Sequence, residues 1–243
     1  MEKEWFSSWF DTKYYHTLYK HRDYSEASLF IDNMVAYLQL KPHAVCWDLC
    51  CGKGRHSVYL NKKGFDVVGT DLSLQSITVA NKEANDTLEF YTHDMRKLFR
   101  TNYFDVVFNL FTSFGYFDKQ HDDLCVFDSV QKSLKQNGLF VFDFLNADYI
   151  KQHLVDHETK TIDGVTFHIS KKIENNTVIK TIHFTDNGKD FSFEERVKLF
   201  NKTYFEELAQ QSHLEIIQTF GNYKLDNFDL QHSPRLILIL QKK

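Results

Sequence analysis

The sequence predicts an α/β protein with a mostly parallel β-sheet covered by helices on both faces, and with an inserted antiparallel β segment. Between residues 44 and 145, short apolar runs of strand length alternate with segments of helical periodicity. Such alternation is typical of parallel strands that are buried on both faces. Beyond residue 150, polar and apolar positions alternate instead, which indicates antiparallel strands. The 243 residues fit one large domain or one core domain with an insertion.

The first 43 residues are rich in aromatic side chains and are expected to form an N-terminal helical cap. Apolar residues recur at helical spacing from Ser25 to Leu38, which predicts a helix there. Pro42 follows and prevents the helix from continuing. The core is therefore expected to begin at residue 44.

The core is expected to open with five strands, at 44–49, 65–70, 88–91, 104–110 and 139–144. Between them, the periodicity predicts helices at 55–63, 73–84 and 122–134. Ser73 is a suitable N-cap for the second of these helices. Gly64 and Asn137-Gly138 are interpreted as helix ends.

After residue 150 we expect a β insertion and then the end of the core. Turn signals at Asn175-Asn176 and Asp186-Asn187-Gly188 divide residues 161–200 into three antiparallel strands. A helix at 204–211 and strands at 214–220 and 236–241 follow. The predicted division is a cap at 1–43, a core made of 44–150 together with 201–243, and an insertion at 151–200.

The composition argues against several classes of protein. With 29 basic and 33 acidic residues and a net charge of −4, the chain lacks the concentrated basic field of a dedicated nucleic-acid binder. No stretch approaches the roughly 20 apolar residues that span a bilayer. The cysteines Cys46, Cys50 and Cys51 crowd into one segment, which argues against a disulfide framework. We expect a cytoplasmic protein without a metal, either a monomer or a homodimer.

The segment from Asp48 to Gly54 carries the strongest functional signal. A carboxylate lies near the end of a predicted strand, glycines follow at 52 and 54, and a helix begins directly afterwards. Glycines permit a tight turn and close approach of the backbone to a ligand. Asp71 ends the next predicted strand, where a ribose presents its two hydroxyl groups. This arrangement predicts a nucleoside cofactor.

Other nucleotide-binding motifs fit the segment less well. A dinucleotide dehydrogenase would require a third glycine at position 57, where this sequence has Ser57. A phosphate-binding P-loop would require Gly-Lys-Ser or Gly-Lys-Thr, and Gly52-Lys53-Gly54 does not supply it.

The motif resembles that of the class I S-adenosylmethionine-dependent methyltransferases of the small-molecule type. Their first motif is an acidic residue followed by glycines at alternate positions, and Asp48-x-Cys50-x-Gly52-x-Gly54 matches it except at Cys50. The resemblance covers about residues 44–145 and the final strand. It implies a Rossmann-like seven-stranded sheet with an antiparallel last strand, and S-adenosylmethionine as the cofactor.

The resemblance also implies roles for the matched residues. The methionine end of the cofactor is expected to lie against the first loop and its flanks: Asp48, Cys50, Gly52, Gly54 and Arg55. Asp71 should bind the ribose hydroxyls, and Leu72 should pack against adenine. Asp94-Met95 should bind the adenine amino group and cover the ring. Asn109-Leu110, at the end of the fourth strand, should approach the sulfonium.

The methyl acceptor is expected outside the carboxyl ends of the strands, where ligands of open α/β sheets bind. Candidate contacts come from the cap, from the loops after the fourth and fifth strands, and from the start of the last strand: Tyr15, Tyr19, Arg22, Phe114, Tyr116, Asn146 and Arg235. No catalytic residue is predicted, because a sulfonium is already an activated leaving group and the protein needs mainly to align the reactants.

The sequence therefore predicts an enzyme that methylates an N or O nucleophile of a small metabolite. The β insertion is similar in layout to the substrate lids of small-molecule methyltransferases, and the near-neutral charge agrees with a small acceptor. An RNA or protein acceptor stays open as an alternative. A non-catalytic module that only binds S-adenosylmethionine is the other alternative.

Overall fold

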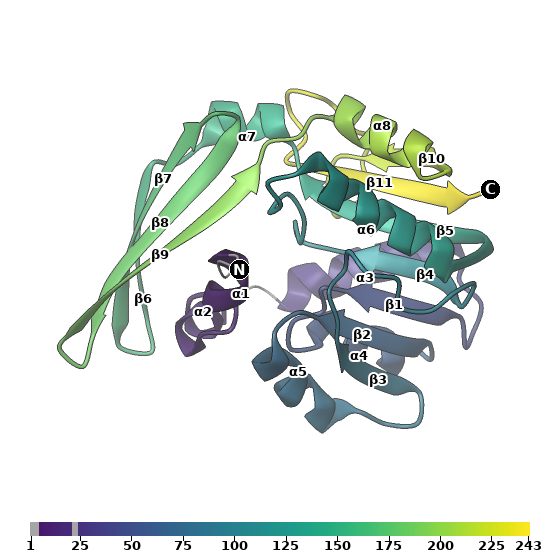
Figure 1. Ribbon diagram of the computed structural model, residues 1–243, viewed down its shortest axis with the longest axis horizontal. Helices are drawn as coiled ribbons and strands as arrows, with labels where there is room; N and C mark the ends of the chain where they lie inside the picture. Colours follow the sequence, from purple (N-terminus) through teal and green to yellow (C-terminus); the bar gives the residue numbers. More distant parts are fainter. Residues whose placement is uncertain (1–4, 21–23) are drawn as a thin grey trace.

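The computed structural model describes residues 5–20 and 24–243, and its centre is a seven-stranded sheet (Figure 1). The strands of this large sheet are β1 (Val45–Leu49), β2 (Asp66–Asp71), β3 (Leu88–Thr92), β4 (Phe104–Asn109), β5 (Leu134–Leu145), β10 (Leu214–Phe220) and β11 (Arg235–Lys242). Their spatial order is β10-β11-β5-β4-β1-β2-β3. The strand β11 pairs antiparallel with both β10 and β5, and all other pairs in this sheet are parallel. The predicted fold class is confirmed, including the antiparallel last strand.

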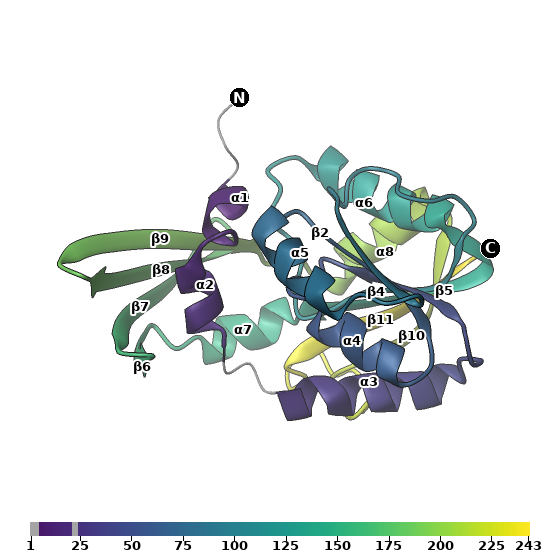
Figure 2. The same ribbon diagram turned by 90° about the horizontal axis from the view of Figure 1, so that it is seen from below.

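Helices cover both faces of the large sheet (Figure 2). One face packs against α3 (Tyr24–Leu38), α4 (Arg55–Lys62) and α5 (Leu74–Ala80), which a 3-10 turn at Asn81–Glu83 extends. The other face packs against α6 (Gln120–Ser133) and α8 (Lys202–Gln211) through a core rich in phenylalanine. Within the described part of the chain, no helix has both the length and the apolar character needed to cross a lipid bilayer.

A second sheet projects from the core and forms the lid (Figure 1). Its strands, in spatial and sequence order, are β6 (His157–Ile162), β7 (Val165–Glu174), β8 (Thr177–Asp186) and β9 (Lys189–Lys198). The short cap helices α1 (Trp5–Trp9) and α2 (Lys13–Leu18) pack against this lid. Trp9 and Leu18 are buried against an apolar cluster of four lid residues: Phe167, Ile169, Ile182 and Phe184. The cap therefore fills the space between lid and core.

The prediction of three lid strands is wrong, because β6 is a fourth. Most residues of β6 are exposed, so polar side chains occupy the strand and the apolar alternation is missing. The turn between β6 and β7 lies at Asp163-Gly164, where both residues have positive φ. The division of the chain at 43, 150 and 200 stays a prediction.

The interpretation of Asn137-Gly138 as the end of the helix predicted at 122–134 is also wrong. The helix α6 ends at Ser133, and β5 begins at once with Leu134. The pairing of β4 with β5 shifts register after Phe104↔Leu134, and Asn137-Gly138 lies within that irregular part of the strand. A seventh helix, α7 (Ala147–His153), replaces the loop expected after the fifth strand.

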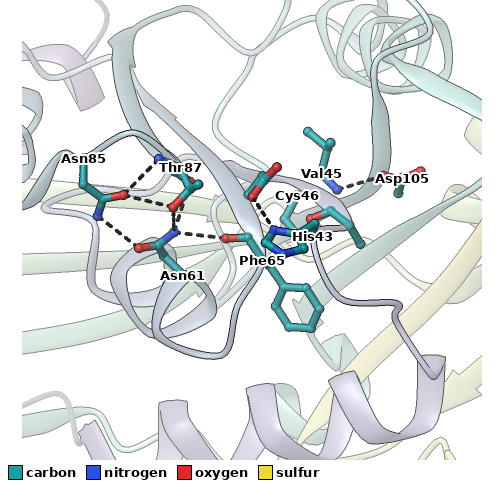
Figure 3. Close-up of polar contacts among 10 residues, drawn as sticks. His43, Val45, Cys46, Asn61, Phe65, Asn85, Thr87 and Asp105 are labelled. Atoms are coloured by element: carbon teal, nitrogen blue, oxygen red, sulfur yellow. Dashed lines mark hydrogen bonds and ion pairs between the residues drawn. The ribbon is translucent and has the colours of Figure 1, made fainter.

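Side-chain hydrogen bonds hold the amino-terminal edge of the large sheet (Figure 3). Asn61 Nδ2 donates to the carbonyl oxygens of Phe65 (3.0 Å) and Thr87 (3.1 Å), at the starts of β2 and β3. The backbone N–H of Val45, the first residue of β1, donates to Asp105 Oδ2 (2.8 Å). These bonds satisfy backbone groups where the chain enters the strands. These side chains therefore stabilise this edge of the sheet.

Burial of Asp123 predicts a stability that depends on pH. Asp123 on α6 is fully buried, its Oδ2 accepts a hydrogen bond from the Tyr204 hydroxyl (2.7 Å), and burial raises its pKa to about 6. Because the folded chain holds this proton more tightly than the unfolded chain, folding stability falls as the pH rises from about 4 to 6. In Asp123→Asn we expect this decrease in folding stability to be smaller by roughly 1–2 kcal/mol. Urea unfolding of the wild type and the variant at about pH 4.5 and 7.5 gives the free energy of unfolding that tests this. If the substitution changes that free energy equally at both pH values, the prediction is contradicted.

Candidate active site

A cavity of about 390 Å³ lies at the carboxyl ends of the core strands, under the cap and the lid. This volume falls in the usual range for small-molecule sites. Core residues of the wall include Cys50 after β1, Asp71 at the end of β2 and Phe111 after β4. The strands β1 and β4 are neighbours, and the chain order reverses between them. Ligands of open α/β sheets bind at such a switch point.

The loop after β1 has a left-handed backbone at three alternate positions. Cys50, Gly52 and Gly54 have φ values of 67°, 55° and 80°. A Cβ atom on Gly54 would lie 2.7 Å from the Phe90 ring, so only glycine fits there. Cys50 adopts the left-handed conformation with a side chain, at a cost of about 1–2 kcal/mol. Its Sγ lies 3.4 Å from Sδ of Met95, in the segment after β3.

Two carboxylates from neighbouring strands frame this loop. Asp71 Oδ2 accepts a hydrogen bond from the Gly52 N–H (2.9 Å), and Oδ1 accepts one from the Ser73 N–H (2.8 Å). Asp48 is buried and accepts a hydrogen bond from the Ser57 hydroxyl (2.6 Å). Burial raises the pKa of Asp48 to about 6 and raises the pKa of Asp71 as well. Both side chains therefore stabilise the conformation of the loop.

Asp94 follows β3 and forms a forked ion pair with Arg96. The Nε and a terminal nitrogen of Arg96 lie 3.0 and 2.7 Å from the two oxygens of Asp94. Burial acts to raise the pKa of Asp94, but the Arg96 hydrogen bonds outweigh it and hold the pKa below its usual value. Asp94 therefore stays ionised on the cavity wall and can accept further donors.

The cavity has features that fit a nucleoside cofactor bearing an amino-acid tail. Leu72 and Leu74 line it while exposing 40% and 64% of their surface, which suits an apolar ring packed on them. Asn109 donates to the carbonyl oxygen of Leu49 (3.1 Å), but its own side-chain oxygen is buried without a partner. Leu110 is buried beside it.

The first turn of α4 stacks on the loop after β4. The His56 ring lies parallel to the Phe111 ring at 5.1 Å, and the Arg55 guanidinium lies 5.3 Å from the same ring. A terminal nitrogen of Arg55 lies 2.9 Å from His56 Nε2. These contacts join the start of α4 to the loop after β4.

Known proteins are similar to this chain both in the sequence of its core and in its fold. Residues 47–138 match the family model described as a methyltransferase domain. The Bacillus subtilis (strain 168) protein YqeM, provisionally named a methyltransferase, is 27% identical over 207 residues, which cover 80% of this chain and 83% of YqeM. These matches support a class I S-adenosylmethionine-dependent methyltransferase, with the family model covering the core from residue 47 to 138.

Two solved structures share the fold of this methyltransferase. An S-adenosylmethionine-dependent methyltransferase from Clostridium acetobutylicum ATCC 824 has a TM-score of 0.79 at 21% identity, and the match covers 94% of this chain and 96% of that one. The sugar N-methyltransferase KedS8 from Streptoalloteichus sp ATCC 53650 has a TM-score of 0.75 at 17% identity, with 94% and 92% covered. Both matches cover nearly the whole chain.

A buried ion pair in the methyltransferase holds a strained turn after β4. Phe111 and Thr112 both have left-handed backbone, with φ of 58° and 63°, which is costly for residues with side chains. Asp143 on β5 is fully buried and accepts the Phe111 N–H (2.7 Å) and the Nε of Arg235 (2.8 Å). Arg235 also donates to Thr112 Oγ1 (2.8 Å). Burial raises the pKa of Asp143, and Arg235 opposes that rise.

The structure brings many of the sequence-predicted site residues together on the cavity wall. They are Cys50, Gly52, Asp71, Leu72, Asp94 and Met95 from the core, with Tyr15 and Tyr19 from the cap and Tyr116 from the loop after β4. Other predicted residues do not line the cavity: Asp48, Gly54, Asn109 and Leu110 are buried, and Arg55 lines a separate small pocket between α3 and α4. Their assigned contacts with cofactor and acceptor stay predictions.

Three residues that were predicted to contact the acceptor make other contacts in the structure. Phe114 is fully buried among phenylalanines of the core. Asn146 caps α7 and donates to the carbonyl oxygens of Leu230 and Ser233 (2.8 Å each). Arg235 holds the strained turn. Arg22 lies outside the described residues.

Sequence reasoning missed several residues of the cavity wall. Trp5, Phe10 and Asp11 come from the cap, and Glu195 comes from β9 of the lid. Glu195 had a detectable signal, because it falls on the same side of β9 as three apolar residues at alternate positions: Phe191, Phe193 and Val197. An acidic residue in such a row marks a polar site on an otherwise apolar face.

Proposed function

We propose that this methyltransferase transfers a methyl group from S-adenosylmethionine to an N or O nucleophile of a small metabolite. The observation that carries the proposal is a cavity of about 390 Å³ whose wall combines the residues expected to bind the cofactor with aromatic residues of the cap. Cap and lid cover it, which suits a small acceptor better than a nucleic acid or a folded protein. The structural neighbour KedS8 is named a sugar N-methyltransferase, and so has an acceptor of this class.

In this proposal the chain binds and orients the reactants. S-adenosylmethionine supplies the methyl group on a sulfonium, which needs no further activation. Asp71 binds the ribose hydroxyls, because its carboxylate lies at the end of β2 on the cavity wall. Leu72 and Leu74 give the adenine ring an apolar surface. The cap and the loop after β4 exclude water, which favours alignment of donor and acceptor.

Calorimetry and a labelled-donor screen test the proposal. We expect S-adenosylhomocysteine to bind with a Kd of about 100 μM or tighter, near −5.5 kcal/mol. We then expect labelled methyl transfer to at least one member of a metabolite library. Transfer to bulk RNA or protein, with none to the metabolites, would contradict the acceptor class. Binding without transfer to any of these acceptors would indicate a non-catalytic module.

A further inference from the structure

Glu195 is a lid carboxylate on the cavity wall with room for another hydrogen-bond donor. Only 14% of its side chain is exposed. Its Oε1 accepts hydrogen bonds from Trp9 Nε1 (2.7 Å) and from the Tyr19 hydroxyl, which lies 2.7 Å from both carboxylate oxygens, and Lys180 Nζ forms an ion pair with Oε2 at 3.5 Å. A carboxylate has about four acceptor positions. Its three neighbours therefore leave capacity for one more donor.

The charged side chains of the wall favour a cation. The wall contains the acidic residues Asp11, Asp71, Asp94 and Glu195, and no lysine or arginine of the described chain lines it. Asp71 and Asp94 are engaged with core groups, as described above. Asp11 accepts hydrogen bonds from the Ser73 hydroxyl (2.7 Å) and from the backbone at the start of α5. Glu195 is thus the lid's charged contribution to the cavity.

Aromatic rings form a continuous row from the core to Glu195, which we call the aromatic wall: Trp5, Phe10, Tyr15, Tyr19 and Tyr116. Tyr116 contacts Phe10 at 5.5 Å between ring centroids, Phe10 contacts Tyr15 at 4.9 Å, and Tyr15 contacts Tyr19 at 4.8 Å. Ring faces attract cations, most strongly where water is excluded. The Lys180 ammonium lies 4.6 Å from the Tyr19 ring centroid, so one cation of the protein is already bound between this ring and Glu195.

We propose that the acceptor is a protonated primary or secondary amine without phosphate or carboxylate groups, held by Glu195 and the aromatic wall. This inference rests on the proposed function and narrows its acceptor. After the bound ammonium releases one proton to water, the nitrogen lone pair forms a bond to the methyl carbon. The electron pair of the broken carbon–sulfur bond stays on sulfur. The products are an N-methylammonium and a neutral thioether.

Matched pairs of amine and alcohol test the charge of the acceptor in the wild-type protein. Suitable probes are 2-phenylethylamine against 2-phenylethanol and glucosamine against glucose, titrated by calorimetry with S-adenosylhomocysteine bound and assayed with labelled donor. We expect an amine to bind at least tenfold more tightly than its alcohol, and only amines to be methylated. Equal affinities, or methylation of alcohols or phosphate-bearing acceptors only, would overturn the inference.

Glu195→Gln tests the residue. We expect at least a tenfold rise in the KM for the methylated amine, with the Kd for S-adenosylhomocysteine changed by less than twofold. Glu194→Gln is the matched control, because Glu194 is the preceding residue on β9 and points to the other face of the lid. An amine KM unchanged in Glu195→Gln would show that Glu195 is only a structural link between lid and cap, and would overturn its role.

Different results would contradict the proposed function and the inference about the acceptor. If S-adenosylhomocysteine binds but no amine is methylated, the inference about the acceptor is wrong and the cofactor assignment stands. If S-adenosylhomocysteine does not bind, the proposed function is wrong and the inference falls with it. Should Glu195→Gln not fold, the amine and alcohol comparison in the wild-type protein still decides.

Discussion

Replacing Arg235 by methionine is expected to destabilise the protein by about 3–5 kcal/mol, because it leaves a buried carboxylate without its cation. Asp143 has no exposed surface, and Arg235 supplies its ion pair at 2.7 Å. The variant also removes the hydrogen bond that fixes Thr112 in its left-handed conformation. Urea unfolding monitored by tryptophan fluorescence measures the loss, and methyl transfer reports on the loop.

Two further variants separate this effect from ordinary charge removal. Lys135→Met breaks an ion pair with Asp105 (2.8 Å) whose side chains are 43% and 36% exposed, and should cost about 0–1 kcal/mol. Adding Asp143→Asn to Arg235→Met removes the uncompensated charge and should recover part of the lost stability. If Arg235→Met is no more destabilising than Lys135→Met, the ion pair does not hold the strained turn.

The second large effect is expected for cofactor binding in Asp71→Ala. If Asp71 binds the ribose, its removal should weaken S-adenosylhomocysteine binding by about 1–3 kcal/mol, or roughly 5- to 150-fold in Kd. The same variant frees the N–H groups of Gly52 and Ser73, which Asp71 now binds, and so loosens the glycine loop. Calorimetry gives the Kd directly.

Asp66→Ala is the matched control for that experiment. Asp66 begins the strand that Asp71 ends, and its side chain is 40% exposed beside His43. It lies at the edge of the sheet away from the cavity, so its loss should leave the Kd unchanged. A Kd in Asp71→Ala within twofold of the Asp66→Ala value would place the ribose elsewhere.

The cofactor half of the site is readable in the sequence because its constraints are local. A strand that ends in an acidic residue, followed by glycines where the backbone must be left-handed, leaves its pattern within about 25 residues. Cys50, Gly52 and Gly54 all have the positive φ that the motif implies. The parallel direction of the core strands follows from the alternation of strand and helix, since a helix that crosses over returns the chain to the same end of the sheet.

The acceptor half depends on contacts between distant parts of the chain. Tyr19 and Glu195 meet although 176 positions separate them. Arg235 was a candidate for the pocket mouth, but its position relative to Asp143 is set by the pairing of β11 with β5. The strand β6 was missed because both of its faces are largely exposed, which removes the apolar alternation. Local patterns contain no information on these tertiary contacts.

The strained turn after β4 also limits how the protein can be redesigned. Phe111 and Thr112 keep their backbone conformation through Asp143, 32 positions from Phe111, and through Arg235, 92 positions beyond Asp143. A loop grafted into residues 111–117 to change acceptor choice would relax unless both partners were kept. Mutant libraries that vary this loop should therefore hold residues 143 and 235 fixed.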